Sequence, residues 1–307
     1  MPPFTRRQML MMLGSAPAAL IGTGDLIPKN PQHLARLEAR INDLFRGENI
    51  GFDLRGWDAI TQRETFRVAV NGDSYYPVAS SFKTLVVLYY FWFTPRELWR
   101  DDPESDAYRV AVFSNNLLTG TLLENTAPYV GGFGNSIQKF NIFLTYTLGL
   151  NSGIFSWDWQ GSPTVGQRDL YYEPTQQRSV IYNGQRYDIT NLFTPRDLSQ
   201  AYLYLLKPTQ FPQHPQAYEA LTRTRALFSI PASGYQSPIE RAFGRYTGKD
   251  GVIPTEDSQF GRVTNDAGIV QPFINDYVIS IMYAQGEFRL VEFLRQIRRY
   301  LIEYEVG

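Results

Sequence analysis

Two residues with catalytic potential, Ser80 and Lys83, stand at the head of an apolar segment, residues 84–91. If this segment is helical, a spacing of three places the serine hydroxyl and the lysine amine on one face, a turn apart. Burial lowers the pKa of a lysine, and a neutral amine can remove the proton of a neighbouring serine. The positive end of a helix also favours the oxyanion that forms when a serine attacks a carbonyl. The pair therefore predicts a serine nucleophile with a lysine base.

The composition removes other common nucleophiles and bases. The chain has 307 residues, no cysteine and two histidines, which excludes cysteine nucleophiles, thiolate metal sites and disulfides. His33 and His214 lie among proline and glutamine residues, and neither is near a serine in a strand-turn-helix context. A Ser-His-Asp triad is the weaker alternative, and lysine is the natural base. Nothing in the sequence calls for a metal or an organic cofactor.

The overall balance of residues is that of a globular protein. Hydrophobic residues make up 43% of the chain, charged residues make up 19%, and the formal net charge is -1. This length and composition suit one large domain, or two lobes that share a cleft. Because the sequence lacks a basic stripe, a nucleic-acid partner is not expected.

The N-terminus has the layout of an export signal. Arg6 and Arg7 precede a short apolar run and a patch of small residues. Together these features predict a twin-arginine signal and linker over residues 1–30, and a mature protein in the periplasm or outside the cell. A plain basic N-terminus is the alternative. The apolar segment at 84–91 is about half the length needed to cross a bilayer, so no stable membrane span is expected after signal removal.

Hydrophobic periodicity predicts the elements that must position the serine and the lysine. A helix and two strands open the chain, and two strands and a helix close it. This order predicts an α+β fold, in which an antiparallel sheet built from both termini is flanked by helices and carries an inserted all-helical lobe. The predicted helices cover residues 34–45 and 290–301, and the predicted strands cover residues 50–54, 64–70, 261–270 and 277–283.

The predicted lobes divide the chain unequally. An α/β lobe takes about residues 31–75 and 225–307, and a helical lobe takes about residues 76–224, with a cleft between the two. Within the helical lobe, residues 151–191 show little periodicity and are rich in polar residues, glycine and aromatics. We expect a long structured loop there, and loops of this length in compact domains are usually functional or mobile.

Two further motifs follow the serine-lysine pair. Residues 114–116 are Ser-Asn-Asn, and residues 249–251 are Lys-Asp-Gly, close to a predicted strand. In order, S-x-x-K, S-x-N and K-x-G resemble the three active-site elements of the serine beta-lactamase and penicillin-binding protein superfamily. Their order and their placement on helix, loop and edge strand indicate more than coincidence.

A fourth segment extends the resemblance. Residues 194–198, Thr-Pro-Arg-Asp-Leu, resemble a helix start of the class A beta-lactamases, in which Thr194 would be the N-cap and Pro195 the first helical residue. The resemblance covers roughly residues 31–307. It implies the family's fold, a mainly antiparallel sheet flanked by helices with a helical lobe, which agrees with the periodicity.

The resemblance implies a role for each polar motif residue. Ser80 would be the acylated nucleophile, and Lys83 would be its base or proton relay. Ser114 would pass a proton toward the leaving group, and Asn116 would bind the acyl amide of the substrate and the Lys83 side chain. Lys249 would supply positive potential opposite Ser114.

The resemblance also implies an oxyanion hole. The backbone N-H groups of Ser80 and Val252, which follows Gly251 in the third motif, would bind the developing negative charge. A purely structural interpretation remains open for each motif residue. Ser80 and Ser114 could cap helices, and Lys249 could be a solvated turn residue.

The second and third motifs depart from the family pattern. Asp250 stands where the family has Thr or Ser, whose hydroxyl helps to bind a substrate carboxylate. Carboxylate-bearing substrates are therefore expected to bind poorly, unless Asp250 turns away or pairs with Lys249. Asn115 replaces an aspartate at a position that is mostly structural. The short interval from Ser80 to Ser114 predicts a more open cleft.

The omega loop is the remaining departure. Glu173, with Gln177 four residues later, is the best candidate for the general base that activates the deacylating water. An exposed loop glutamate is an equal alternative. Without such a base, the acyl-enzyme would persist or pass its acyl group to another nucleophile.

These observations predict an exported serine hydrolase that forms an acyl-enzyme on Ser80. By resemblance, hydrolysis of a beta-lactam amide is the leading activity, and D,D-peptidase or esterase chemistry of the penicillin-binding type is the alternative. A non-catalytic homologue that binds peptidoglycan or a protein is a further alternative. The expected partner is a small molecule or peptide with an amide or ester, beta-lactam or peptidoglycan-like.

Overall fold

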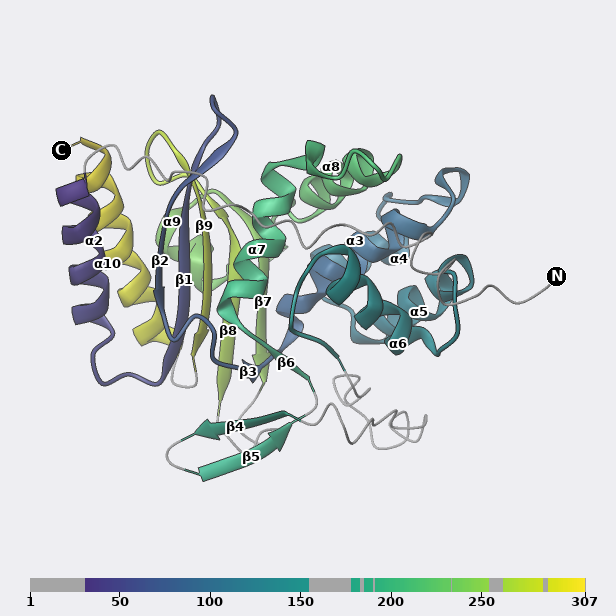
Figure 1. The fold of residues 1–307 in the computed structure, drawn as a ribbon, viewed down its shortest axis with the longest axis horizontal. Helices are drawn as coiled ribbons and strands as arrows, with labels where there is room; N and C mark the ends of the chain where they lie inside the picture. Colours follow the sequence, from purple (N-terminus) through teal and green to yellow (C-terminus); the bar gives the residue numbers. More distant parts are fainter. Residues whose placement is uncertain are drawn as a thin grey trace.

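A computed structural model gives the fold of the chain (Figure 1). It describes residues 31–154, 178–182, 185–189, 191–232, 234–253, 262–283 and 287–306. The predicted export signal lies outside these residues, and it stays a prediction together with the exact division into lobes. Within the part that is described, no helix combines the length and the apolar character needed to span a membrane.

An antiparallel sheet of five strands, built from both ends of the chain, forms the frame of the molecule. The strand order is β2-β1-β9-β8-β7, so the N-terminal hairpin pairs with the C-terminal strand β9. This arrangement confirms the predicted sheet. The strands are β1 (Ile50–Asp58), β2 (Arg63–Val70), β7 (Tyr246–Ile253), β8 (Val263–Val270) and β9 (Asp276–Tyr283).

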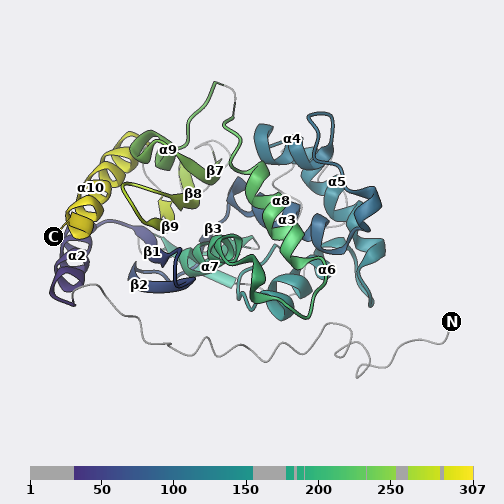
Figure 2. The same ribbon diagram turned by 90° about the horizontal axis from the view of Figure 1, so that it is seen from above.

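Helices cover both faces of this sheet, and as a result residues 50–57 of β1 are all buried. On one face, the N-terminal and C-terminal helices α2 (Pro31–Leu44) and α10 (Glu287–Val306) lie side by side, with α9 (Pro238–Phe243) next to α10 (Figure 1). On the other face, α7 (Pro195–Leu206) packs on β1, β8 and β9 and separates the sheet from the helical lobe (Figure 2).

The helical lobe is built around α3 (Lys83–Phe93), which continues from the short 3-10 helix η1 (Ser80–Phe82). Residues 83–92 of α3 are all buried, because other helices surround it. Those helices are α4 (Asp106–Phe113), α5 (Asn116–Thr126), α6 (Ser136–Ile142), α8 (Ala217–Leu227), the π-helical turn η4 (Phe143–Thr147), and the 3-10 turns η2 (Arg96–Leu98), η3 (Ala127–Tyr129) and η7 (Pro208–Gln210).

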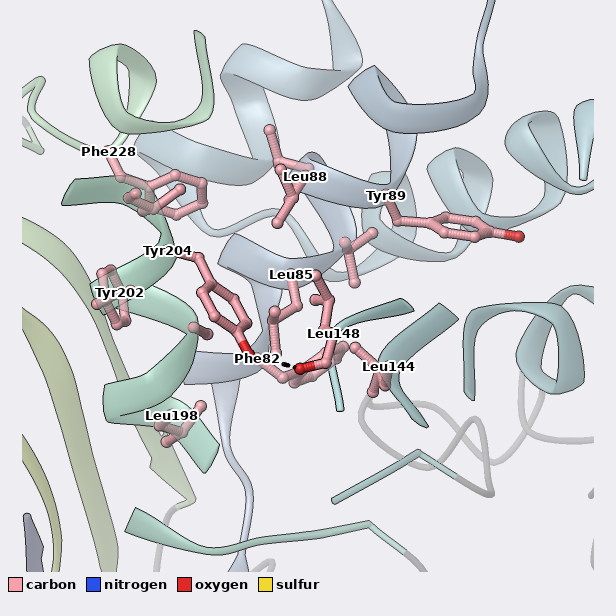
Figure 3. Close-up of a cluster of buried hydrophobic side chains, with 14 of the residues drawn as sticks. Phe82, Leu85, Leu88, Tyr89, Leu144, Leu148, Leu198, Tyr202, Tyr204 and Phe228 are labelled. Atoms are coloured by element: carbon pink, nitrogen blue, oxygen red, sulfur yellow. Dashed lines mark hydrogen bonds between the residues drawn. The ribbon is translucent and has the colours of Figure 1, made fainter. Parts of the chain in front are cut away.

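One hydrophobic cluster joins α7 to α3. Figure 3 shows Leu198, Tyr202 and Tyr204 of α7 beside Phe82 and the first turns of α3. The hydroxyl of Tyr204 donates a hydrogen bond of 2.7 Å to the carbonyl oxygen of Leu148. The polar group of this buried side chain therefore has a hydrogen-bond partner. The helix that covers the sheet is therefore part of the core that holds Lys83.

The start of α7 follows the sequence prediction. Thr194 is the N-cap, and its hydroxyl accepts a hydrogen bond of 3.1 Å from the backbone N-H of Asp197. Pro195 is the first helical residue, where its fixed backbone angle suits a helix and its missing N-H costs nothing. The Asp197 carboxylate in turn accepts hydrogen bonds from the Ser152 hydroxyl at 2.5 Å and the backbone N-H of Asn151 at 2.9 Å.

Part of the long structured loop predicted over residues 151–191 forms a pair of strands. Strands β4 (Arg178–Tyr182) and β5 (Gln185–Ile189) pair as an antiparallel hairpin, and β3 (Tyr76–Pro77) pairs with β6 (Leu192–Phe193). The lobe that interrupts the sheet is therefore not purely helical. The sequence held a signal for the hairpin, because Asn-Gly at 183–184 between two β-prone runs favours a tight turn.

A buried network of hydrogen bonds and ion pairs connects β1 to β2 and α7. The carboxylate of Asp53, which has no exposed surface, accepts from Arg55 at 2.9 Å, from Arg67 of β2 at 2.6 Å and from the Ser199 hydroxyl of α7 at 2.6 Å. Arg55 also donates to Gln200 of α7 at 2.7 Å. Because Arg55 belongs to this network, β1 runs beyond its predicted end at residue 54 and stays buried.

Candidate active site

Lys83 lies at the junction of η1 and α3, three residues after Ser80. Its backbone N-H donates to the carbonyl oxygen of Ser80, which fixes the two residues one turn apart. The side chain of Lys83 has no exposed surface. Its Nζ is 2.7 Å from the carbonyl oxygen of Ser114, 3.0 Å from the Ser114 Oγ and 2.5 Å from the Asn116 Oδ1. The structure therefore brings the first two motifs into direct contact.

The turn between α4 and α5 explains how residues 114 and 116 both reach the lysine. Ser114 ends α4 in the left-handed conformation, with φ at 55°. Asn115 is the N-cap of α5, and its side chain accepts from the backbone N-H of Leu118 at 3.0 Å. The left-handed residue reverses the chain, so that the carbonyl and hydroxyl of Ser114 face Lys83. The structural interpretation of Ser114 as a helix end is correct, and its side chain meets the lysine as well.

The charge state of Lys83 is set by its surroundings. Burial lowers the pKa of Lys83 from its ordinary value to about 7, with a further lowering from the positive charge of Lys249 and a smaller opposing effect from Asp250. Desolvation dominates because an ammonium loses its hydration when it is enclosed. At neutral pH a large part of the population therefore carries an uncharged amine with a free lone pair.

Strand β7 passes against the start of η1. A β-carbon added at Gly251 would lie 2.3 Å from the backbone nitrogen of Ser80 and 2.6 Å from the β-carbon of Ala79. Only glycine leaves room for this approach. The third motif is therefore held beside the serine, and Val252 follows as the next residue of β7, in register with Thr264 of β8.

Lys249 and Asp250 of this strand form an ion pair. The Lys249 Nζ is 2.8 Å from the Asp250 Oδ1, and the two side chains keep only 10% and 15% of their surface exposed. Asp250 therefore pairs with Lys249, which is one of the two arrangements named from the sequence. The pairing lessens the repulsion of a substrate carboxylate, but it also withdraws the ammonium that would attract one. Tyr235 lies near Asp250, and burial together with the charge of this carboxylate raises the pKa of Tyr235.

A buried acid on the neighbouring strand, Asp266, was not singled out from the sequence. Asp266 stands opposite Asp250 in the register of β7 and β8 and has no exposed surface. Its carboxyl accepts a hydrogen bond from the Tyr246 hydroxyl, and another from the backbone N-H of Ile239 at 2.7 Å. Burial and the nearby charge of Asp250 raise the pKa of Asp266. A polar residue in the middle of a buried strand was the available signal.

Comparison with solved structures identifies the architecture. Several solved structures of beta-lactamases match the chain over most of its length. The beta-lactamase of Sphaerobacter thermophilus has a TM-score of 0.56 at 14% identity, with 91% of this chain and 98% of that chain covered. For the Streptomyces albus G beta-lactamase the TM-score is 0.54 at 15% identity, with 86% and 98% covered. The chain has the fold of the serine beta-lactamases.

The same fold occurs in a reconstructed protein, the last common ancestor of the class A beta-lactamases of Gram-negative bacteria. There the TM-score is 0.53 at 14% identity, with 87% of this chain and 98% of that chain covered. No family model matches the sequence, and no curated protein matches it. At this identity the comparisons establish the fold, and the chemistry depends on the side chains described above.

One part of the predicted site, the deacylation base, is not placed by this geometry. Glu173 and Gln177 lie outside the described residues, so the deacylation base stays a prediction. Beside the second motif, Phe113 and Leu117 keep 59% and 55% of their surface exposed, which gives the S-x-N turn an apolar border. In the described part of the beta-lactamase fold, no cluster of three or more histidine and acidic side chains is placed to hold a metal ion.

Proposed function

We propose that the protein is a serine hydrolase that forms an acyl-enzyme on Ser80 and acts on an amide or an ester. The observation that carries the proposal is the enclosed amine of Lys83, with a pKa of about 7, one turn from Ser80 and bound to Ser114 and Asn116. A lysine that served only to support the fold would lower the stability of the protein in this position, because burying an ammonium costs free energy.

The hydrogen bonds of Lys83 support its role as a base. A neutral amine has two N-H donors and one lone pair. The carbonyl oxygen of Ser114 and the Oδ1 of Asn116 can only accept, so they take the two donors. The lone pair, which faces the Ser114 hydroxyl at 3.0 Å, is the basic site of the amine. We infer that it receives the Ser80 proton as Oγ forms a bond to the substrate carbonyl carbon.

The later steps use the remaining motif residues. The negative charge on the former carbonyl oxygen would be held by the backbone N-H groups of Ser80 and Val252, where each donor is worth roughly 3 kcal/mol in sites of this kind. The proton on Lys83 would pass through the Ser114 hydroxyl, 3.0 Å away, to the leaving group as its bond to carbon breaks. Water activated by Glu173 would then release the acyl group.

Beta-lactam hydrolysis is the activity that the fold suggests first, and D,D-peptidase or esterase chemistry is the second candidate. Within the second candidate the ion pair of Lys249 with Asp250 favours the esterase, because it occupies the residues that would otherwise bind a substrate carboxylate, which beta-lactams and peptidoglycan stems both carry. The arginine pair at Arg6 and Arg7 supports export as the route to a periplasmic or extracellular site of action.

Intact-protein mass spectrometry tests the proposal. The protein is incubated with a fluorescent penicillin and, separately, with an aryl phenylacetate, and quenched samples are taken from seconds to hours. We expect an adduct of the acyl mass on Ser80 and no adduct on a Ser80→Ala variant. A lasting adduct indicates slow deacylation, and rapid phenol or product release indicates turnover. Absence of any adduct and of any product would support the non-catalytic alternative.

Replacing Gly251 with alanine is expected to lower the acylation rate by about 100-fold, because a misplacement of about 1 Å has this effect on a positioned nucleophile. The added β-carbon would collide with the backbone nitrogen of Ser80 and would push β7 away from η1. The rate of phenol release from an aryl ester measures the effect. Gly149→Ala is the control for glycine loss, since nothing lies near its β-carbon position and its cost is confined to backbone strain far from β7.

A further inference from the structure

The ion pair at the third motif carries a consequence for the choice of substrate. We propose that the site selects acyl donors whose leaving group is neutral or cationic, and discriminates against those whose leaving group bears a carboxylate. This inference rests on the proposed acylation of Ser80 and names the class of substrate that the same site takes. Asp250, with Lys249 and Tyr235 as its partners, is the specificity-determining residue.

The first support is that Lys249 is already neutralised. Its Nζ lies 2.8 Å from the Asp250 carboxylate, and both side chains are mostly enclosed. Since enclosed charges are screened little by water and salt, the attraction within this pair is strong. An incoming carboxylate would have to compete with Asp250 for the same ammonium. The pairing thus removes the attraction for an anion and leaves a second carboxylate next to it.

The second support is the charge of the groups around the pair. Lys83 has a pKa of about 7, and its N-H groups are engaged by Ser114 and Asn116, so above neutral pH it offers no positive charge to a substrate. Asp266, across the strand from Asp250, is held toward its neutral form by burial. Above neutral pH these four groups together carry no net positive charge, so an anion gains no net attraction from them.

The third support is the geometry of the Asp250 carboxylate. It belongs to β7, the last strand in the sheet order, where no further strand of that sheet covers it. Tyr235 is close enough for the charge of this carboxylate to raise the pKa of its hydroxyl, and 42% of the surface of Tyr235 is exposed. A carboxylate beside an exposed aromatic ring is a suitable surface for an ammonium group, through charge and through the face of the ring.

Three esters of phenylacetic acid that differ only in the leaving phenol test the inference. The phenol bears a carboxylate, a carboxamide or an aminomethyl group at the meta position. Acylation rates are taken from the burst of phenol release at about pH 8 and are divided by the spontaneous hydrolysis rate of each ester. We expect the neutral and cationic esters to acylate about tenfold faster or more than the carboxylate ester, the ratio that a modest charge interaction gives.

Two substitutions test whether Asp250 causes the selectivity between leaving groups. Asp250→Asn and Asp250→Thr are each expected to raise the relative rate of the carboxylate ester by about tenfold, because Lys249 is released to bind it. Asp43→Asn removes the same charge from the surface of α2, where Asp43 pairs with Arg46, and is expected to leave the ratio unchanged. Equal normalised rates in the unaltered protein, or a ratio that both Asp250 variants leave intact, would overturn the inference.

A binding measurement tests the selectivity separately from the acylation on which the inference rests. The three matching anilides of phenylacetic acid are titrated calorimetrically into the Ser80→Ala variant, which needs no chemistry. If the carboxylate anilide binds weakest but no ester acylates the unaltered protein, the selectivity stands and the proposed hydrolase activity fails. If the esters acylate Ser80 at equal rates and the anilides bind equally, the hydrolase activity stands and the selectivity is wrong.

Discussion

Replacing Lys83 with methionine is expected to lower the rate of Ser80 acylation by about 10²- to 10⁴-fold, the usual contribution of a positioned general base. Methionine has a similar length and no charge to desolvate, so it fits the enclosed position of the lysine. The loss would fall on the chemical step, and the affinity for uncleaved ligands would stay within a few-fold. Single-turnover phenol release from an aryl ester measures the rate constant directly.

The pH profile gives the same prediction a second readout. The amine is a base only when it is unprotonated, so the acylation rate of the unaltered protein should rise about tenfold per pH unit below the pKa of about 7 and level off above it. In Lys83→Met this rise should vanish. Lys207→Met removes a lysine that ends α7, and it should keep both the rate and the profile. A Lys83→Met variant that acylates at the original rate would exclude lysine as the base.

The largest effect on stability is expected at Asp53. Asp53→Ala should lower the free energy of unfolding by about 3 to 5 kcal/mol, because the buried charge of Arg55 loses its closer carboxylate partner and keeps only Glu64 at 3.4 Å. The same change removes the contacts of β1 with Arg67 of β2 and Ser199 of α7. Urea titration followed by circular dichroism measures the free energy of unfolding.

A surface carboxylate provides the comparison for Asp53. Asp43→Ala breaks an exposed pair with Arg46 and should change the free energy of unfolding by less than about 1 kcal/mol. If Asp53→Ala lowered the free energy of unfolding no more than Asp43→Ala does, the network would not stabilise the packing of the sheet against α7. A second variant, Ser199→Ala, should cost about 1 kcal/mol, since one neutral hydrogen-bonding group is lost.

Much of the frame was predictable from the sequence because it depends on local patterns. Alternating and helical periodicities gave the strands and helices at both ends, and Thr194 gave the start of α7 from its capping chemistry. The contact between Lys83 and Asn116 followed from the order of the motifs and the resemblance. These signals are carried by a few residues that are close together in the chain.

The ion pair of Lys249 with Asp250 was named from the sequence only as one of two possibilities, for a physical reason. Successive side chains of a strand point to opposite faces, so adjacent residues are expected to stay apart. At an edge strand both side chains can bend around the open side and meet, and the position of β7 in the sheet order is a tertiary fact. Tyr235 and Asp266 reach Asp250 from distant parts of the sequence, where no local pattern announces them.

The pairing of β1 with β9 has a consequence for how the chain folds during its synthesis. Ile50 is opposite Tyr283 in the register, so a ribosome delivers the first strand long before its neighbour exists. Contacts this distant in sequence close large loops and form late in folding. In the meantime the apolar faces of β1 and β2 must be shielded by other means, and the nascent chain depends on a helper or on its own helices until the final strand arrives.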